Sequence, residues 1–179
     1  MIKLENFRFI QLKNGYILNY HKNLRITVLK EDVILLGEAY SIHSSENNLA
    51  DDLSDVIEME VLIDRISYWS GRWVLLWHEY IIPDASALLN VYYAKNVAAS
   101  SLRLISEFTE SQINRGDVHI SDYFGMNFFP SPLTPFVGIK RLMPSQIYNI
   151  TNNNVIDTEL LSKSDYTALS NEQRVKLII

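Results

Sequence analysis

The chain contains no cysteine among its 179 residues. This absence excludes disulfide bridges, thiolate metal sites and a cysteine nucleophile together. It also agrees with a reducing compartment, and we therefore expect a cytoplasmic protein.

Long apolar runs and basic runs are missing as well. The longest apolar stretches, such as 33–36 and 73–77, have the length of a strand and fall far short of the ~20 residues that cross a bilayer. The first residues lack the apolar core and cleavage site of a signal peptide. The net charge is −5 without any run of Lys and Arg, so the composition does not favour nucleic-acid binding. We expect neither a membrane span nor a nucleic-acid partner.

Motifs for catalysis, metals and cofactors are also absent. The four histidines lie in separate segments without metal-ligand spacing: His21, His43, His78 and His119. There is no phosphate-binding loop and no dinucleotide glycine pattern, and no Gly-x-Ser-x-Gly elbow surrounds Ser100 and Ser101. The dipeptide His78-Glu79 is typical of a surface pair at a hairpin rather than of a catalytic dyad. We therefore expect no catalytic residue, no cofactor and no metal ion.

What remains is the composition of one globular domain, with 47% hydrophobic and 11% aromatic residues. The first half favours strands. Runs 7–12 and 16–20 flank Asn14-Gly15, which predicts a hairpin with a type I′ turn. Run 24–29 alternates in part, and run 33–42 is apolar on both faces at its start, as expected in the middle of a sheet.

Two segments have helical spacing. Residues 51–66 place Leu53, Ile57 and Val61, with Leu62 and Ile66, on one face. Their acids Asp51, Asp52 and Asp55 fit the positive end of a helix dipole, and a cation site is the alternative. Ser100 or Ser101 is expected to cap a second helix that ends near Asn114, with Leu102, Ile105 and Phe108 on one face.

The second half is expected to contain a further hairpin. Runs 73–77 and 88–93 would pair through the Pro83-Asp84 turn, because proline fixes φ and aspartate bonds locally. Runs 139–142 and 146–150 predict either a strand pair or a bend followed by a strand. A last strand is expected over 155–161.

Four segments in this order carry a resemblance to a known family. They are Ser70-Gly71-Arg72, the stretch from Ile82 through Asp84 to Tyr92-Tyr93-Ala94, Ala98 to Ser101, and Thr134-Pro135-Phe136-Val137-Gly138-Ile139-Lys140-Arg141-Leu142-Met143-Pro144-Ser145. From about Val33 onward the chain resembles the glutaminase-type N-terminal domain of asparagine synthase-like proteins. The chain departs from the family pattern at three places, with Ser145 for the last glycine, Pro83 before the aspartate, and Leu88 for the glycine of that turn.

The resemblance does not extend to the catalytic residues. Active members use a cysteine exposed by removal of the initiator Met, with its own amine as the base. Here residue 2 is Ile2, and the Arg-Leu-x-Ile-x-Asp, Asn-Gly-Glu and Ser-Asp-Thr-Glu segments that hold glutamine are missing. The Ser-Gly-Gly-x-Asp-Ser loop that binds ATP is missing too. The resemblance therefore implies neither glutaminase nor adenylating activity. By resemblance, Asp84 braces a turn, and Lys140-Arg141 position a loop, with anion binding as the alternative.

The fold implied by this resemblance is α+β, a four-layer αββα sandwich of two mainly antiparallel sheets, as in N-terminal nucleophile hydrolases. Residues 1–165 are expected to form that sandwich. Residues 166–179 are expected to be a linker and the start of a helix, because Ser170 to Gln173 match a capping box. By resemblance, this helix leads into a synthetase domain. The alternative is a short helix that packs back on the sandwich.

The function implied is that of a non-catalytic glutaminase-like domain of an asparagine synthase-like, ATP-dependent amide-forming protein. Such proteins transfer amides to small molecules or sugars, or cyclise peptides, and the degenerate domain would have a structural or acceptor-shaping role. The expected partner is a synthetase (ATP pyrophosphatase-type) domain in cis or in trans. The apolar end of the last helix is a candidate homodimer contact. It consists of Val175, Leu177, Ile178 and Ile179.

Two other functions stay open. The first is a stand-alone ligand- or peptide-binding module on a degenerate N-terminal nucleophile hydrolase fold, with aromatic residues bordering its cleft unless they belong to the core. These aromatic residues are Tyr123, Phe124, Phe128, Phe129 and Phe136. The second is a hydrolase with a serine or threonine, such as Thr27, uncovered by self-processing, although nothing in the sequence marks a cleavage point.

Overall fold

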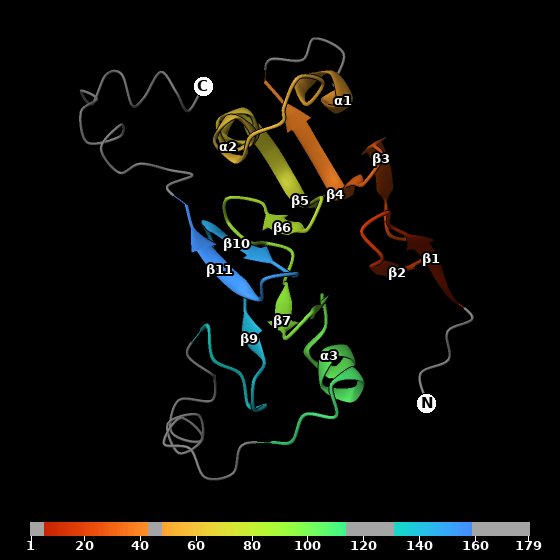
Figure 1. The fold of residues 1–179 in the computed structure, drawn as a ribbon, viewed down its shortest axis with the longest axis vertical. Coiled ribbons are helices and arrows are strands. Elements are labelled where there is room, and N and C mark those ends of the chain that lie inside the picture. The colour runs from red at the N-terminus through yellow and green to blue at the C-terminus, as the bar shows by residue number, and fades with distance from the viewer. Residues whose placement is uncertain (1–5, 43–47, 114–130, 159–179) are drawn as a thin grey trace, which may run out of the picture.

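The computed structural model describes residues 6–42, 48–113 and 131–158, and its centre is a six-stranded antiparallel sheet (Figure 1). The strand order is β11-β10-β6-β5-β4-β3. The strands of this sheet are β3 (Ile26–Lys30), β4 (Val33–Ser41), β5 (Trp69–Trp77), β6 (Tyr80–Pro83), β10 (Gln146–Asn149) and β11 (Asn154–Asp157). The long strands β4 and β5 pair along their whole lengths, from Val33↔Trp77 to Ser41↔Trp69.

The N-terminal hairpin forms a sheet of its own. Strands β1 (Phe7–Gln11) and β2 (Ile17–His21) pair antiparallel, which confirms the predicted hairpin. The turn is wider than the predicted two-residue type I′ turn, because the Leu12 amide donates to the Tyr16 carbonyl (2.9 Å). Gly15 takes the positive φ of 88° that this loop requires.

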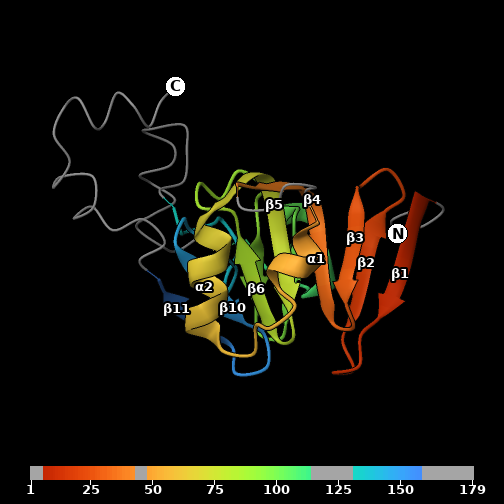
Figure 2. The same ribbon diagram turned by 90° about the horizontal axis from the view of Figure 1, so that it is seen from above.

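Two helices cover one face of the central sheet. These are α1 (Leu49–Asp52) and α2 (Met59–Ser67), which lie side by side over β4 and β5 (Figures 1 and 2). They enclose one core cluster between themselves and the sheet. Its largest members are aromatic and aliphatic side chains of alternate positions on β5, namely Trp69, Trp73, Leu75 and Trp77.

The opposite face of the sheet is covered by strands. A three-stranded sheet of order β8-β7-β9 consists of β7 (Tyr92–Ala94), β8 (Val97–Ala99) and β9 (Lys140–Arg141). Helix α3 (Leu102–Phe108) contacts β7 and β8. The second core cluster contains Val74 and Leu76 of β5, and Ile10 and Leu18 of the hairpin pack against it. The central sheet is therefore buried on both faces, which explains why β4 begins with consecutive apolar residues.

The predicted four-layer αββα sandwich is wrong. Within the described residues the protein is mostly β, with three small antiparallel sheets of two, six and three strands. The helices have only four, nine and seven residues, too few to form two covering layers. Strand-rich patterning was visible in the sequence, but the two helices predicted over 51–66 and up to Asn114, which supported the layering, are shorter in the structure.

The helix predicted over residues 51–66 is divided in two. α1 ends at Asp52, and α2 begins only at Met59. Leu53 and Val56, which lie in the break, are buried, whereas Ile57 is 83% exposed. The periodic pattern therefore belongs to α2 alone, where Leu62 and Ile66 point into the core.

The hairpin predicted between 73–77 and 88–93 is also wrong. β5 turns at His78 and pairs with β6, so that Trp77 lies opposite Tyr80. His78 has φ 55°, and its amide donates to the Asp32 carbonyl (3.1 Å). Only the Pro83-Asp84 turn was predicted in this region, but the structure has two turns, of which the first is at His78. The second, at Asp84, carries the chain to the other sheet.

Other local predictions have mixed outcomes. The Ser101 hydroxyl accepts from the Leu104 amide (3.5 Å) and caps α3, as predicted, but α3 ends at Phe108 rather than near Asn114. Ile105 is buried whereas Phe108 is 77% exposed. β9 and β10 are both strands but lie in different sheets, so neither a strand pair nor a bend followed by a strand describes this segment fully. The predictions for His43, His119, the aromatic residues at 123–129 and residues 166–179 lie outside the described residues.

Candidate functional site

A groove of about 340 Å³ lies where β3 and β4 meet the start of α1. Thr27 and Leu29 of β3 and Leu35 and Ala39 of β4 contribute apolar and hydroxyl groups to its lining. Leu49 of α1 adds an apolar side chain, and this leucine is buried. The groove is open to solvent along the outer strand of the central sheet, so an extended or small ligand could reach it.

Charged groups form one rim of the groove. Arg25 Nη1 donates to Glu38 Oε1 at 2.8 Å, and the Tyr40 hydroxyl donates to Glu38 Oε2 at 3.4 Å. The Arg25 and Glu38 side chains are 65% and 53% exposed. Solvent therefore screens their attraction, and a ligand charge could replace either partner at little cost.

Gly37 shapes the floor of this groove. It lies in the middle of β4 with φ 92°, and its amide donates to the Arg25 carbonyl (2.9 Å). A Cβ at this position would overlap the Arg72 carbonyl, and a Cβ at Gly71 would overlap the Glu38 carbonyl. The two glycines thus let β4 and β5 approach closely on either side of the Glu38↔Arg72 pair.

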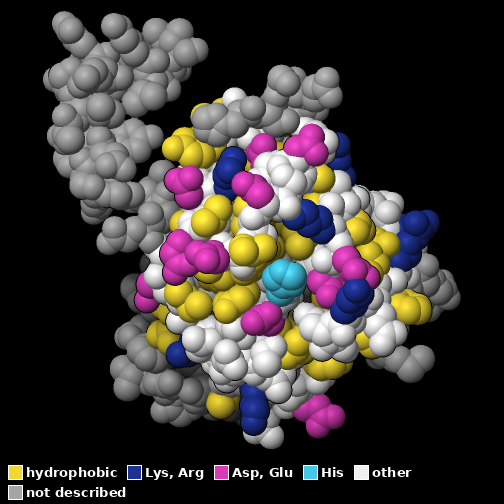
Figure 3. All heavy atoms as spheres, turned by 45° about the horizontal axis from the view of Figure 1, so that its top comes forward, with side chains coloured by type: hydrophobic (Ala, Val, Ile, Leu, Met, Phe, Trp, Pro, Cys, Tyr) yellow, Lys and Arg dark blue, Asp and Glu magenta, His cyan; other side chains and the backbone are white. Residues whose placement is uncertain are grey.

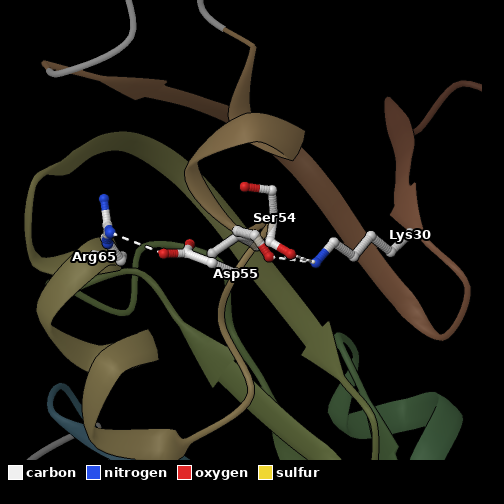
Figure 4. A network of polar contacts seen from close by, with 5 residues as sticks. Lys30, Ser54, Asp55 and Arg65 are labelled. Atoms are coloured by element: carbon white, nitrogen blue, oxygen red, sulfur yellow. Dashed lines mark hydrogen bonds and ion pairs between the residues drawn. The ribbon is translucent and has the colours of Figure 1, made fainter.

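Lys30 connects the outer strand to the helices. Its ammonium group donates to the Leu53 carbonyl (2.5 Å) and the Ser54 carbonyl (2.7 Å), just after the end of α1 (Figure 4). A cation is favourable at this end of a helix, where carbonyl groups lack intrahelical partners. Beside it, Asp55 forms an ion pair with Arg65 of α2 (3.4 Å). Lys30 therefore connects β3 to the end of α1, two elements that contribute residues to the lining of the groove. Its ammonium group does not extend into solvent beyond the sheet.

The acidic cluster has local partners, as expected for a helix start. Asp51 accepts from Asn48 Nδ2 (2.6 Å), and Asp52 accepts from Trp69 Nε1 (3.0 Å). Both lie in the first turn of α1. Among the described residues no group of three or more His, Asp or Glu side chains could hold a metal ion. Figure 3 shows this helix-bearing face, where hydrophobic side chains alternate with scattered acids and bases.

The described histidines stand apart. His21 ends β2 and forms an edge contact with Phe7, and His78 forms one with Trp77. His78 lies at the tight turn after β5, which agrees with the predicted surface pair.

Asp84 is a structural carboxylate. It is only 4% exposed, and its oxygens accept from the amides of Ser86 (3.0 Å) and Leu88 (3.2 Å). Its own carbonyl accepts from the Ala87 amide (2.8 Å). All of these bonds lie within one turn, so Asp84 braces the crossing from β6 toward β7, as the resemblance implied.

Three of the four segments that carry the resemblance come together around β7, whereas Ser70-Gly71-Arg72 lies in β5 and pairs with β4. Tyr92 lies opposite Arg141 and Tyr93 opposite Lys140, and the Leu142 amide donates to the Val91 carbonyl (2.8 Å). The Arg141 amide donates to the Pro132 carbonyl (2.8 Å), whereas its Nε is buried with no hydrogen-bond partner in the described part of the chain. Lys140 and Arg141 thus form the short strand β9, whereas the resemblance implied that they position a loop.

A buried tyrosine connects the two strand layers. The Tyr148 hydroxyl donates to the Ala94 carbonyl (2.6 Å) and lies 2.9 Å from Asn153 Oδ1. Burial raises the pKa of Tyr148 to about 12, because the phenolate would lose its hydration. Burial also raises the pKa of Tyr93, whose ring lies 4.6 Å from that of Tyr148.

The groove is the feature that the sequence did not single out. An isolated glycine within the apolar run 33–42 was the available signal, since such a glycine often marks a close backbone approach. Arg25 and Glu38 lie 13 residues apart, and only the register of β3 against β4 brings them together. The described lining of the groove offers apolar surface together with the hydrogen-bonding side chains of Arg25, Glu38 and Tyr40.

No helix in the described ranges has the length and apolar character needed to cross a bilayer. In comparisons with known proteins, no family model and no curated protein matches this chain.

Proposed function

We propose that this chain is a non-catalytic domain of the asparagine synthase-like type, which packs against an ATP-dependent synthetase domain and helps to shape its acceptor site. The observation that supports this proposal is the meeting of three of the four resembling segments around β7, where β8 and β9 pair with β7 and the Leu142 amide donates to the Val91 carbonyl. Segments separated by about fifty residues in the sequence thus build one local structure.

The proposal relies on these segments and not on the four-layer sandwich, which the structure overturns. It assigns no glutaminase reaction to the chain, because cysteine is absent and residue 2 is Ile2. Amide transfer to a small molecule or sugar, or peptide cyclisation, would belong to the synthetase domain. The cytoplasm, expected from the sequence, remains part of the proposal.

A binding experiment tests the proposal. The purified chain is titrated with an asparagine synthase-like synthetase domain encoded with it, and the complex is measured by calorimetry. Val137 is 57% exposed within the resembling segment, so Val137→Asp is expected to weaken the complex at least about tenfold by placing a charge in the contact. Ile57→Asp, at a site just before α2 that is 83% exposed, is the control and should bind as the natural chain does.

A second measurement addresses the reaction. Glutamine incubated with the chain should release ammonia only at the rate of the buffer. Release above that rate would contradict the non-catalytic assignment. Equal binding by the Val137 and Ile57 variants would show that the resembling segment does not form the contact.

A further inference from the structure

The outer strand β3 has backbone N–H and C=O groups that form no hydrogen bond within the described structure. The Gly37 amide donates to the Arg25 carbonyl, and Thr27 lies opposite Leu35 two residues further along. In an antiparallel pair, hydrogen-bonded residues alternate with residues whose backbone groups point away. Ile26 and Val28 therefore direct their N–H and C=O groups outward, and in the described residues these groups have no hydrogen-bond partner.

Within the described residues, protection of this edge against strand addition is limited to a register irregularity between Val28 and Lys30, beyond the Ile26 and Val28 groups. Natural edge strands are often guarded by a lysine or by a cover. Here the Lys30 ammonium is drawn back onto the Leu53 and Ser54 carbonyls, away from the edge. Val28 is 60% exposed and β-branched, a side chain that packs well against a neighbouring strand.

The charged residues near β3 differ between its two ends, because basic residues precede the strand and acidic residues follow it. Residues 6–30 contain five basic residues and no acidic one, although the whole chain has net charge −5. Lys22 and Arg25 lie at the beginning of β3, whereas Glu31 and Asp32 follow its end. An added strand is therefore complementary when its acidic end lies beside Lys22 and Arg25.

The space beside β3 suits a single strand. The β1–β2 hairpin extends further outward than β3 on the side of the sheet that carries α3 (Figures 1 and 2). A second copy that paired through its own β3 would bring a second hairpin into this same space. A lone peptide meets no such obstacle, and the groove beside Thr27 and Leu29 can receive one of its side chains.

We propose that the outer edge of β3 binds an extended peptide with an acidic C-terminal part, added antiparallel as a further strand of the central sheet. The Ile26 and Val28 backbone groups supply the hydrogen bonds, as in other cases of strand addition. Lys22 and Arg25 set the direction. This binding site is separate from the contact with a synthetase domain.

Hydrogen exchange of single amides tests the proposal directly. The probe is the blocked peptide acetyl-Thr-Val-Thr-Val-Asp-Asp-amide, added to the full chain and followed by nuclear magnetic resonance. With probe at about ten times its Kd, exchange of the Ile26 and Val28 amides should slow about tenfold. The Thr27 amide, already bonded within the sheet, serves as the internal control and should change little.

Two substitutions separate backbone pairing from side-chain contact. Val28→Pro removes the outward N–H but leaves the inward bonds of β3, since proline is tolerated on an edge strand with its nitrogen facing outward. We expect it to abolish probe binding while exchange at Leu35 stays slow. Val28→Thr keeps both the N–H and the β-branched shape and should bind within about twofold of the natural chain.

Charge-reversing substitutions test the direction in which the added peptide lies along β3. Lys22→Glu should weaken the acidic probe about two- to fivefold and strengthen the probe with two C-terminal lysines, whereas Lys140→Glu on β9 should change neither. Absence of protection at about 10 mM probe, ten times a weak Kd of 1 mM, would overturn the proposal. Undiminished binding by Val28→Pro would do the same. Protection that rises with protein concentration without probe would identify a second copy as the occupant and would also overturn it.

Discussion

The fold depends most directly on the absence of a side chain at Gly37 and Gly71. Both have positive φ, 92° and 117°, inside the two longest strands. At either position the atom nearest to an added Cβ is a backbone carbonyl oxygen of the facing strand, which cannot move aside as the end of a side chain can. The close approach of β4 and β5, and with it the floor of the groove, requires glycine at these two positions.

Gly37→Ala should lower the free energy of unfolding by more than about 3 kcal/mol, because backbone strain and a clash with the Arg72 carbonyl add together. The control is Gly138→Ala, at φ 76° with nothing within 4 Å of the added Cβ, which should cost only about 1 kcal/mol. Urea denaturation of both variants measures the difference. Equal losses in the free energy of unfolding of the two variants would show that the positive φ accounts for the whole effect and that the clash with the Arg72 carbonyl adds nothing.

Tyr148 carries the clearest pH dependence. Its folded pKa of about 12 lies above the ordinary value of 10.0, so the stability that depends on the neutral phenol is complete below pH 10. It is lost as the pH rises from 10 through the folded pKa, because the unfolded chain loses this proton first.

Tyr148→Phe should remove part of this alkaline loss of stability. The measurement is the urea midpoint of both proteins between pH 9 and pH 12, together with the ultraviolet titration of the phenolates. Tyr148→Phe will be less stable at neutral pH, since the bond to Ala94 is lost. Its midpoint should nevertheless fall less steeply with pH. Parallel curves for the two proteins would contradict the raised pKa.

At the scale of elements, α1 is a helix of four residues that could not exist alone. It is held by packing of Leu49 and Leu53 and by Lys30 at its C-terminal carbonyl groups. The sequence placed helical residues here, but the division between α1 and α2 follows from these tertiary contacts.

Lys30→Met removes the ammonium group but keeps most of the apolar stem. We expect a loss of about 1–3 kcal/mol in the free energy of unfolding, since two carbonyl groups lose a charged donor. Lys13→Met is the control, because Lys13 and Glu31 form an exposed ion pair that should contribute less than about 1 kcal/mol. Comparable losses in the two variants would mean that Lys30 does not fasten α1.

At the scale of the whole molecule, both faces of the central sheet are covered, by helices on one side and by strands on the other. Neighbouring residues of β5 therefore enter different clusters. Leu75 belongs to the helix side and Leu76 to the strand side.

Leu75→Ala and Leu76→Ala should each lower the free energy of unfolding by about 2–5 kcal/mol, because each leaves a cavity in a packed cluster. A sheet with one solvated face would instead give a large loss at only one of the two positions. Ile57→Ala, at 83% exposure, should stay within about 0.5 kcal/mol. Denaturant unfolding with constant slope is the measurement, and a near-neutral Leu76→Ala would show that the strand side is not packed.

The sequence by itself determined the features that depend on neighbouring residues. The hairpin at Asn14-Gly15, the capping Ser101, the buried start of β4 and the turn at Asp84 could all be predicted, because backbone φ preferences, local hydrogen bonds and apolar periodicity act within a few residues. The absence of a cysteine nucleophile was equally certain.

Only the tertiary structure decided how these pieces combine. The pairing of β5 with β6 rather than with 88–93 requires a turn at His78 that was not predicted, and the break of the predicted helix at Leu53 is accompanied by a hydrogen bond from Lys30 of β3. The groove of Arg25, Glu38 and Gly37 exists because strand register joins residues that are distant in sequence. Such choices rest on long-range packing, where differences of a few kcal/mol between competing arrangements are invisible to local patterns.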